Sequence, residues 1–155
     1  MVVTGSGKTT VGAPLSDALG WPFLDADDFH PATNIRKMAS GAPLTDEDRA
    51  PWLALLRSKI AEAHSRGESG VLACSALKEI YRIDLLSAAP THVIYLKATS
   101  DLIRARLAGR PDHFMPPALI DSQFDDLEEP QVALTIPAGS PPDEIVKAIR
   151  AQLRV

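Results

Sequence analysis

The stretch Gly5-Ser6-Gly7-Lys8-Thr9-Thr10 gives the strongest indication of the fold, because it follows a short apolar run and opens an amphipathic segment. A phosphate-binding loop requires this context. Glycines let backbone N–H groups converge on phosphate oxygens, and the following helix adds the positive end of its dipole. In such a loop Lys8 reaches the β and γ phosphates, and the Thr9 hydroxyl binds Mg²⁺. We therefore expect Gly5, Ser6, Gly7, Lys8, Thr9 and Thr10 to bind a nucleotide.

Two residues depart from the usual pattern of this loop. The full pattern has a glycine six residues before the lysine, and that position is Val2. A native loop with a real departure and a start site placed inside the first strand would both give this sequence. Pro14 interrupts the following helix, so we expect a kink near Thr10. The alternative to a nucleotide loop is a glycine-rich turn with a chance Lys-Thr pair.

Short apolar runs alternate along the chain with helix-length amphipathic segments, which is typical of βα units and a parallel sheet. The gaps between the runs are long enough for crossover helices. The expected strands are Met1–Val3, Phe23–Asp25, Val71–Cys74, His92–Leu96 and Val132–Ile136. The sequence therefore predicts an α/β fold, with a single domain over residues 1–155 and five parallel strands.

The amphipathic segments predict the positions of the helices. The first should end at Gly20, and the second should begin at Pro51, after a capped turn at 45–48, and end at Gly67. Ser100 should cap a further helix. The remaining two expected helices are Ser75–Ala88 and Asp143–Leu153. The helix Ser75–Ala88 should bury Leu77, Ile80, Tyr81 and Leu85.

The composition is that of an ordinary globular domain. Of the 155 residues 45% are hydrophobic, and the net charge is −4. Because affinity for a phosphate backbone needs clustered Lys and Arg, this charge argues against a nucleic-acid partner. No window reaches the ~18–20 consecutive apolar residues of a membrane span, so we expect no membrane association and a cytoplasmic location. The single cysteine, Cys74, has no partner for a disulfide within the chain.

Two carboxylates lie where the second expected strand ends. Asp25 and Asp27 fall at the edge where open α/β sheets bind ligands, and alternation puts both on one face. Phosphoryl transfer to an alcohol needs one carboxylate to hold a water on Mg²⁺ and another to accept the hydroxyl proton. The alternative is a solvated acidic loop.

A basic group lies further along the chain. Its members are Lys97, Arg104, Arg106 and Arg110. By itself this pattern is an ordinary solvated helix face. Beside a phosphate loop, however, an arginine carried by a closing lid stabilises the charge that spreads over the transferring phosphoryl group. We expect such a lid at about residues 108–117, where the chain is basic and rich in turn-forming residues.

Longer motifs add a resemblance. The stretch Phe23–Pro31 is followed by Asn34, Lys37-Met38, Gly41, Pro43-Leu44, Asp46, Asp48-Arg49 and Pro51-Trp52-Leu53, and then by Cys74–Lys78, Tyr81-Arg82, Ile94–Lys97, His113–Met115, Ser122-Gln123 and Leu127-Glu128. Together they closely resemble the gluconokinases, small P-loop kinases related to shikimate kinase. The resemblance covers nearly the whole chain.

The resemblance implies ATP-dependent phosphorylation of D-gluconate at O6 by a homodimer, on a P-loop kinase-type parallel sheet of order 2-3-1-4-5 flanked by helices, with a lid. It implies that the loop binds ATP and Mg²⁺, that Asp27 lies at the substrate hydroxyl, and that Asp25 is on the metal side with Thr9. The residues on the sugar-acid side are then His30, Lys37, Arg49 and Arg82, and the lid arginines are Arg106 and Arg110. We expect Lys8, Asp27, Arg106 and Arg110 to be catalytic.

Three alternatives stay open at this point. His30 can bind substrate or simply pack at a strand-to-helix corner. A related kinase for shikimate or another aldonate would keep the loop, the lid and Asp27. A binding protein that has lost turnover through Val2 and Pro14 would keep the fold, although nothing structural requires the whole catalytic set.

Overall fold

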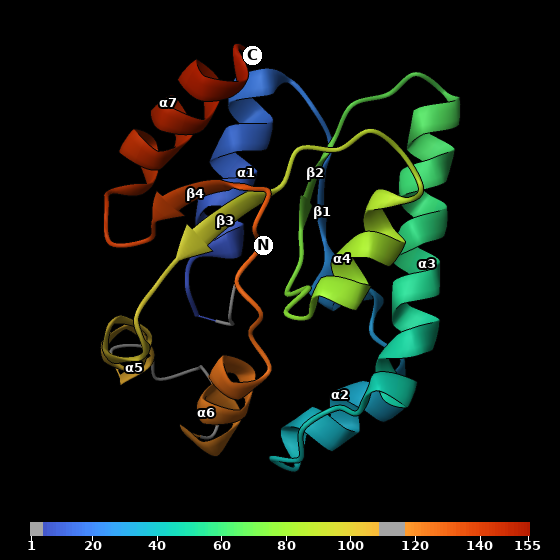
Figure 1. The fold of residues 1–155 in the computed structure, drawn as a ribbon, viewed down its shortest axis with the longest axis vertical. Coiled ribbons are helices and arrows are strands. Elements are labelled where there is room, and N and C mark those ends of the chain that lie inside the picture. The colour runs from blue at the N-terminus through green and yellow to red at the C-terminus, as the bar shows by residue number, and fades with distance from the viewer. Residues whose placement is uncertain (1–4, 109–116) are drawn as a thin grey trace.

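The structure is a computed structural model that describes residues 5–108 and 117–155. Helices and strands alternate along the chain (Figure 1). The elements are α1 (Lys8–Leu19), β1 (Phe23–Asp25), the 3₁₀ helix η1 (Ala26–Phe29), α2 (Ala32–Ala39), α3 (Asp46–Ser65), β2 (Val71–Ala73), α4 (Glu79–Leu86), β3 (Ile94–Lys97), α5 (Ser100–Ala108), α6 (Pro117–Asp125), β4 (Leu134–Pro137) and α7 (Pro142–Leu153). The predicted α/β class is confirmed.

The four described strands form two parallel pairs. β1 pairs with β2, so that Asp25 lies opposite Ala73, and β3 pairs with β4, so that Lys97 lies opposite Pro137. These strands begin and end within two residues of the predicted ones. The predicted strand Met1–Val3 lies outside the described residues. The structure therefore shows two two-stranded sheets, and it does not show one sheet of five strands.

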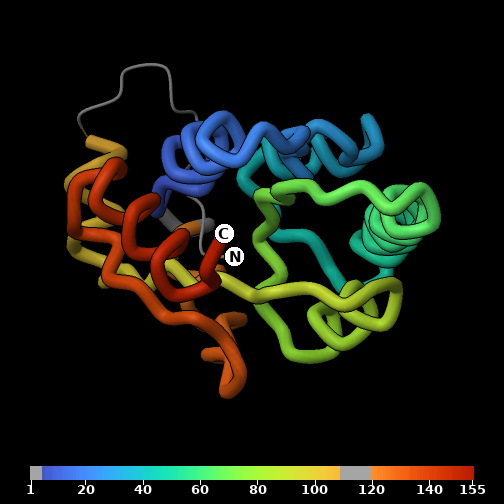
Figure 2. Tube along the Cα trace, turned by 90° about the horizontal axis from the view of Figure 1, so that it is seen from above, coloured from blue at the N-terminus to red at the C-terminus, as the bar shows by residue number. Residues whose placement is uncertain are grey.

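Each pair of strands has its own hydrophobic core. Leu15 of α1 packs with Tyr95 of β3 and Ile149 of α7, whereas Trp52 and Leu56 of α3 pack under β2 and α4. Seen from above, α7 and α3 lie at opposite ends of the molecule, and α1 runs along one side (Figure 2). Helix α1 contacts both β1 and β2 as well as α7. It therefore connects the two halves and aims its N-terminus at the carboxyl ends of the strands.

The close approach of α1 to β1 requires a glycine. A Cβ atom at Gly12 would lie only 2.7 Å from a ring carbon of Phe23. Helix α1 includes Pro14 and ends, as predicted, where Gly20 takes a left-handed conformation with φ of 66°. No helix in residues 5–108 or 117–155 is long and apolar enough to cross a membrane.

Three of the predicted helix starts are wrong. Helix α3 begins at Asp46 and includes Pro51, because the Thr45 hydroxyl caps the Asp48 N–H while the Asp48 carboxylate caps the Thr45 N–H. This reciprocal cap satisfies two backbone N–H donors, so the helix begins before Pro51 although the proline has no N–H to donate within it. Helix α5 is capped by the hydroxyl of Thr99, one residue before Ser100, which accepts from the Leu102 N–H at 3.3 Å.

Helix α4 also differs from its prediction. It begins at Glu79, because residues 75–78 form a loop that ends in the extended Lys78. Leu77, Tyr81 and Leu85 are buried as predicted, whereas Ile80 is 67% exposed. The buried face of this short helix carries Tyr81, Arg82 and Leu85, and Ile80 points away from it. Helices α2 and α6 were not predicted.

Candidate active site

The loop before α1 has the backbone that an anion site needs. Gly5 and Gly7 have φ of 83° and 103°, a region that L side chains rarely adopt. Gly7 is the N-cap of α1 and provides no side-chain cap for the first turn. The N–H groups of that turn are therefore directed at whatever lies in front of the helix, where the dipole favours an anion.

Lys8 and Asp27 meet beside this loop. The Lys8 side chain is almost fully buried, and its Nζ lies 3.9 Å from Oδ2 of Asp27, whose side chain is half exposed. Asp27 is carried by η1, which follows β1 directly. The structure thus brings Lys8 and Asp27 together, and their roles toward phosphate and acceptor stay predictions.

Thr9 and Asp25 form the neighbouring pair. The Thr9 hydroxyl donates to Oδ2 of Asp25 at 2.7 Å, and Oδ1 of Asp25 accepts from the Asp27 N–H at 3.1 Å. A hydroxyl and a carboxylate this close are a suitable donor set for Mg²⁺, which keeps several waters and takes its other ligands from phosphates. Across the described part of the chain, no three His, Cys, Asp or Glu side chains gather as a metal cage.

His30 directly follows η1, which carries Asp27, and it lies against Trp52 of α3. Their rings are stacked, with centroids 4.4 Å apart and planes inclined by 12°. The Trp52 indole N–H donates to the Ala26 carbonyl at 2.7 Å, which anchors the start of η1. Burial lowers the pKa of His30, the charge of Asp27 opposes this shift, and Arg49 adds to it. Burial therefore favours the neutral form of His30, which lies close to Asp27 and Arg49.

Arg49 lies at the same side, in the first turns of α3. Its guanidinium is over the ring of Tyr81 at 5.6 Å and is 3.8 Å from Oδ2 of Asp126, and its side chain is 11% exposed. Lys78 approaches the same ring at 5.8 Å. Asp46 accepts hydrogen bonds from both Lys78 and the Tyr81 hydroxyl. Two cations thus flank one aromatic ring at the start of α3.

Lys37 connects α2 to α3. Its ammonium pairs with the Asp48 carboxylate, and the Asn34 amide donates to the Asp48 carbonyl at 2.7 Å. The pairing places Lys37 at the start of α3, because its partner Asp48 directly precedes Arg49 in the sequence. These contacts fix α2 in position, and the role of Lys37 toward a substrate stays a prediction.

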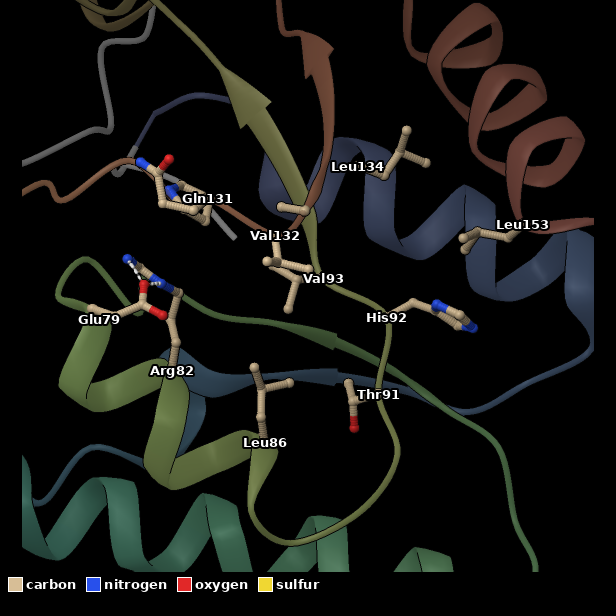
Figure 3. A pocket seen from close by; sticks show the side chains of 12 residues that line it. Glu79, Arg82, Leu86, Thr91, His92, Val93, Gln131, Val132, Leu134 and Leu153 are labelled. Carbon is tan, nitrogen blue, oxygen red and sulfur yellow. Dashed lines mark hydrogen bonds and ion pairs between the residues drawn. The ribbon is translucent and has the colours of Figure 1, made fainter.

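Arg82 is not brought together with the other predicted site residues. Its guanidinium is 3% exposed, pairs with Glu79, and donates to the carbonyls of Ala76 and Leu77 at 3.1 and 2.7 Å. With Glu79 it faces a cavity of about 520 Å³ toward Gln131 and Val132 (Figure 3). None of the residues that line this cavity belongs to 5–10 or 25–30. Arg82 therefore holds the loop between β2 and α4.

Arg106 reaches the phosphate loop from the end of α5. Its two terminal nitrogens donate to the carbonyl oxygens of Ser6, at 2.8 Å, and Ala138. Lys97 and Arg104 instead pair with the exposed carboxylates of Glu129 and Asp121. The predicted Arg110 and nearly all of the predicted lid lie outside the described residues.

Comparison with known proteins agrees with this geometry. The sequence model of the family described as shikimate kinase matches residues 4–132. The thermosensitive gluconokinase of Escherichia coli is 46% identical over 132 residues, which cover 84% of this chain and 71% of that protein. The chain belongs to the gluconokinase family. The crystal structure of a gluconokinase from Sinorhizobium meliloti has a TM-score of 0.90 at 39% identity, covering 99% of this chain and 89% of that one.

A sugar kinase from Janibacter sp. is as similar to this gluconokinase-family chain. Its TM-score is 0.93 at 37% identity, and the match covers 100% of this chain and 92% of the other. The fold is thus the P-loop kinase fold of the shikimate kinase group.

The sequence did not single out two residues that lie beside the candidate site in this member of the gluconokinase family. Trp52 looked like an ordinary core residue, and only the fold shows that it holds both His30 and the start of η1. Ser75 follows β2 at the edge that carries Asp25 and Asp27, and its position directly after a strand was the available signal. Burial raises the pKa of the neighbouring Cys74 thiol to about 12, which disfavours the thiolate, the nucleophilic form.

Proposed function

We propose that this protein transfers the γ-phosphoryl group of ATP to O6 of D-gluconate, which gives 6-phospho-D-gluconate and ADP. The activity named for its relatives supports this substrate. The observation that carries the proposal is the 3.9 Å approach of Lys8 to Asp27, because it places a phosphate-binding cation beside a carboxylate suited to an alcohol.

The chain supplies a group for each part of the transfer. The Asp27 carboxylate accepts the proton of the O6 hydroxyl, the new O6–P bond forms as the bond to the β-phosphate oxygen breaks, and ADP leaves. Lys8 and the N–H groups of the first turn of α1 hold the phosphate oxygens. Thr9 and Asp25 would hold Mg²⁺, which when bound neutralises charge on the phosphates.

Arg49 is the cation that best suits the carboxylate of the acceptor. Its Nε is buried and has no hydrogen-bond partner in residues 5–108 and 117–155. An arginine held over an aromatic ring keeps its planar face fixed and its edge available for a carboxylate. Lys37 and His30 lie on the same side and complete the proposed acceptor site.

Two structural points belong to the same proposal. We expect the two parallel pairs to be the outer parts of one sheet of order 2-3-1-4-5, in which the predicted strand Met1–Val3 is strand 1. In that numbering β1 and β2 are strands 2 and 3, and β3 and β4 are strands 4 and 5, so both observed pairs are neighbours in this order. We also expect a homodimer, as the resemblance implies. Sedimentation of the purified protein measures this state directly.

An assay of ADP release over a panel of acids tests the activity. Purified protein with ATP and Mg²⁺ is offered gluconate, other aldonates and shikimate, and Lys8→Ala serves as the inactive control. The proposal predicts turnover on gluconate that falls more than tenfold in Lys8→Ala, a loss of about 1.4 kcal/mol or more in transition-state stabilisation. Preference for shikimate, or equal turnover by Lys8→Ala, would contradict it.

A further inference from the structure

Ser75 lies at the edge of the sheet where the reaction takes place. Strand β2 ends at Ala73, directly opposite Asp25 in the parallel pair, and Ser75 is two residues further on. Because the carboxyl ends of parallel strands meet at one edge, the loop that follows β2 and the turn that follows β1 face the same region. Ser75 is thus beside the turn that carries Asp27.

The packing on either side of Ser75 confirms this placement. Cys74 and Ala76 are buried in the cluster that also contains Ala26 and Trp52. Ala26 begins the 3₁₀ turn of Asp27, and Trp52 stacks on His30. The charges of Asp27 and Lys8 both act on the thiol of Cys74, as their effects on its pKa show. The residues on either side of Ser75 therefore pack against the elements that carry the proposed acceptor site.

The hydroxyl of Ser75 has no hydrogen-bond partner among the described residues, although its oxygen is buried. Only two other buried side-chain atoms in that part of the chain share this condition, Nδ1 of His30 and Nε of Arg49, and both come from the acceptor side. A buried polar atom without a partner is costly, so proteins keep one where a ligand supplies the missing bond. Three such atoms on elements around Trp52 indicate a ligand that has several hydrogen-bonding groups.

The chemistry of the three atoms indicates which groups these are. A serine hydroxyl both donates and accepts and carries no charge, so it matches an alcohol better than a carboxylate or a phosphate. A neutral imidazole nitrogen has the same preference, whereas an arginine N–H suits a carboxylate. An open-chain polyhydroxy acid presents both kinds of group.

We propose that the Ser75 hydroxyl binds a secondary hydroxyl of the acceptor and is a specificity-determining residue for a polyhydroxylated chain. This inference rests on the proposed function, since it concerns the acceptor of the same transfer. It adds a contact in the loop after β2 to those expected from η1 and α3.

Substitution of Ser75 by alanine tests the contact. For Ser75→Ala we expect the KM for gluconate to rise about tenfold, which corresponds to about 1.4 kcal/mol, with kcat and the KM for ATP unchanged. The matched control is Ser87→Ala, since the Ser87 hydroxyl is exposed and donates to the Asp84 carbonyl at the end of α4. This control should keep all three constants and a similar melting temperature.

Deoxy analogues of the acceptor then separate a direct contact from an indirect effect. Gluconate and its monodeoxy derivatives at C2, C3, C4 and C5 are assayed with the wild type and with Ser75→Ala. The ratio of the two kcat/KM values should stay near tenfold for most acids and fall to one for the derivative that lacks the contacted hydroxyl.

Two other results would refute different proposals. An unchanged KM for gluconate in Ser75→Ala, or a ratio that is the same for every acid, would refute the Ser75 contact while leaving the kinase activity in place. A wild-type protein that does not phosphorylate gluconate would refute the proposed function, and the Ser75 contact with it.

Discussion

Asp27 occupies a position that depends on its neighbour. The Asp25 carboxylate caps η1 by accepting from the Asp27 N–H, and it also accepts from the Thr9 hydroxyl. The Asp27 carboxylate is half exposed and lies beside Lys8. The two aspartates therefore differ: Asp25 shapes the turn, and Asp27 is the carboxylate that we propose for the acceptor hydroxyl.

Asp27→Asn should separate chemistry from nucleotide binding. The amide keeps the shape of the side chain and removes its ability to take the O6 proton, so kcat should fall by ~10²–10⁴-fold with little change in the KM for ATP. Steady-state kinetics with each substrate varied in turn measure both constants. Loss of ATP affinity with an intact kcat would instead assign Asp27 to the nucleotide or the metal.

His30 should make stability depend on pH. Its pKa is lowered from 6.5 mainly by burial, so the unfolded chain binds more protons than the folded one between the folded value and 6.5. The free energy of unfolding is therefore unaffected by the titration of His30 above pH 6.5, and it falls as the pH drops below that value and the unfolded chain takes up the proton. We compare free energies of unfolding of the wild type and His30→Phe, which keeps the stack on Trp52 but cannot titrate.

The wild type should lose more stability than His30→Phe between pH 7.5 and pH 5. Denaturant unfolding at each pH gives the difference between the two proteins, in which the shared carboxylates largely cancel. Parallel curves for the two proteins would show that burial does not hold His30 neutral.

Among the elements, α3 shows how a local cap positions the site. The cap between Thr45 and Asp48 starts the helix at Asp46, and this start places Arg49 and Trp52 on the turns that face η1. Asp48 also holds Lys37 and Asn34 of α2. The start of α3 thus fixes two helices of the acceptor side together.

Thr45→Ala should therefore destabilise the protein by about 1 kcal/mol, the usual cost of losing a threonine cap. Thermal unfolding should show a fall of about 2–4 °C in melting temperature for a chain of this size. Ser65→Ala, at the far end of the same helix, is the control, because that hydroxyl only donates to the Glu62 carbonyl at the surface. Equal melting temperatures for the two variants would contradict the role of the cap.

At the scale of the whole molecule, Arg106 joins three distant segments. It projects from α5 and holds the carbonyls of Ser6, in the phosphate loop, and Ala138, after β4. The same guanidinium lies beside Gly7, where a Cβ atom would be 3.8 Å from one of its terminal nitrogens, an ordinary contact distance. Its hydrogen bonds support the shape of the loop, and its position is the one that the proposed role toward the charge of a nucleotide requires.

Arg106→Ala should lower both the melting temperature and kcat/KM for ATP, the latter by tenfold or more, because a charge-assisted bond to the loop and a cation near the phosphates are lost together. Arg104→Ala is the matched control, since within residues 5–108 and 117–155 that arginine pairs only with the exposed Asp121, and it should be close to the wild type. If the two variants had the same kcat/KM, Arg106 would have no role toward the nucleotide.

Signals within a few residues of one another were sufficient for part of this structure. The sequence by itself determined the loop from Gly5 to Thr10, the αβ alternation, and four strands to within two residues, including the strand end at Asp25. The expectation that strand alternation puts Asp25 and Asp27 on one face was wrong, because the chain turns into η1 directly after Asp25. The expectations for Pro51 and Ile80 were also wrong, because a side-chain cap and the choice of buried helix face are set by neighbours in space.

Contacts between distant segments were decided only by the tertiary structure. Trp52 donates a hydrogen bond to the Ala26 carbonyl, and Arg106 donates to the carbonyls of Ser6 and Ala138. Arg82 donates to the Ala76 carbonyl in the loop before its own helix. The unpartnered hydroxyl of Ser75 is likewise visible only once burial is known. Periodicity and motifs report the local preferences of the chain, whereas hydrogen bonds and burial depend on which faces of the elements meet, and only the packing of both cores fixes that.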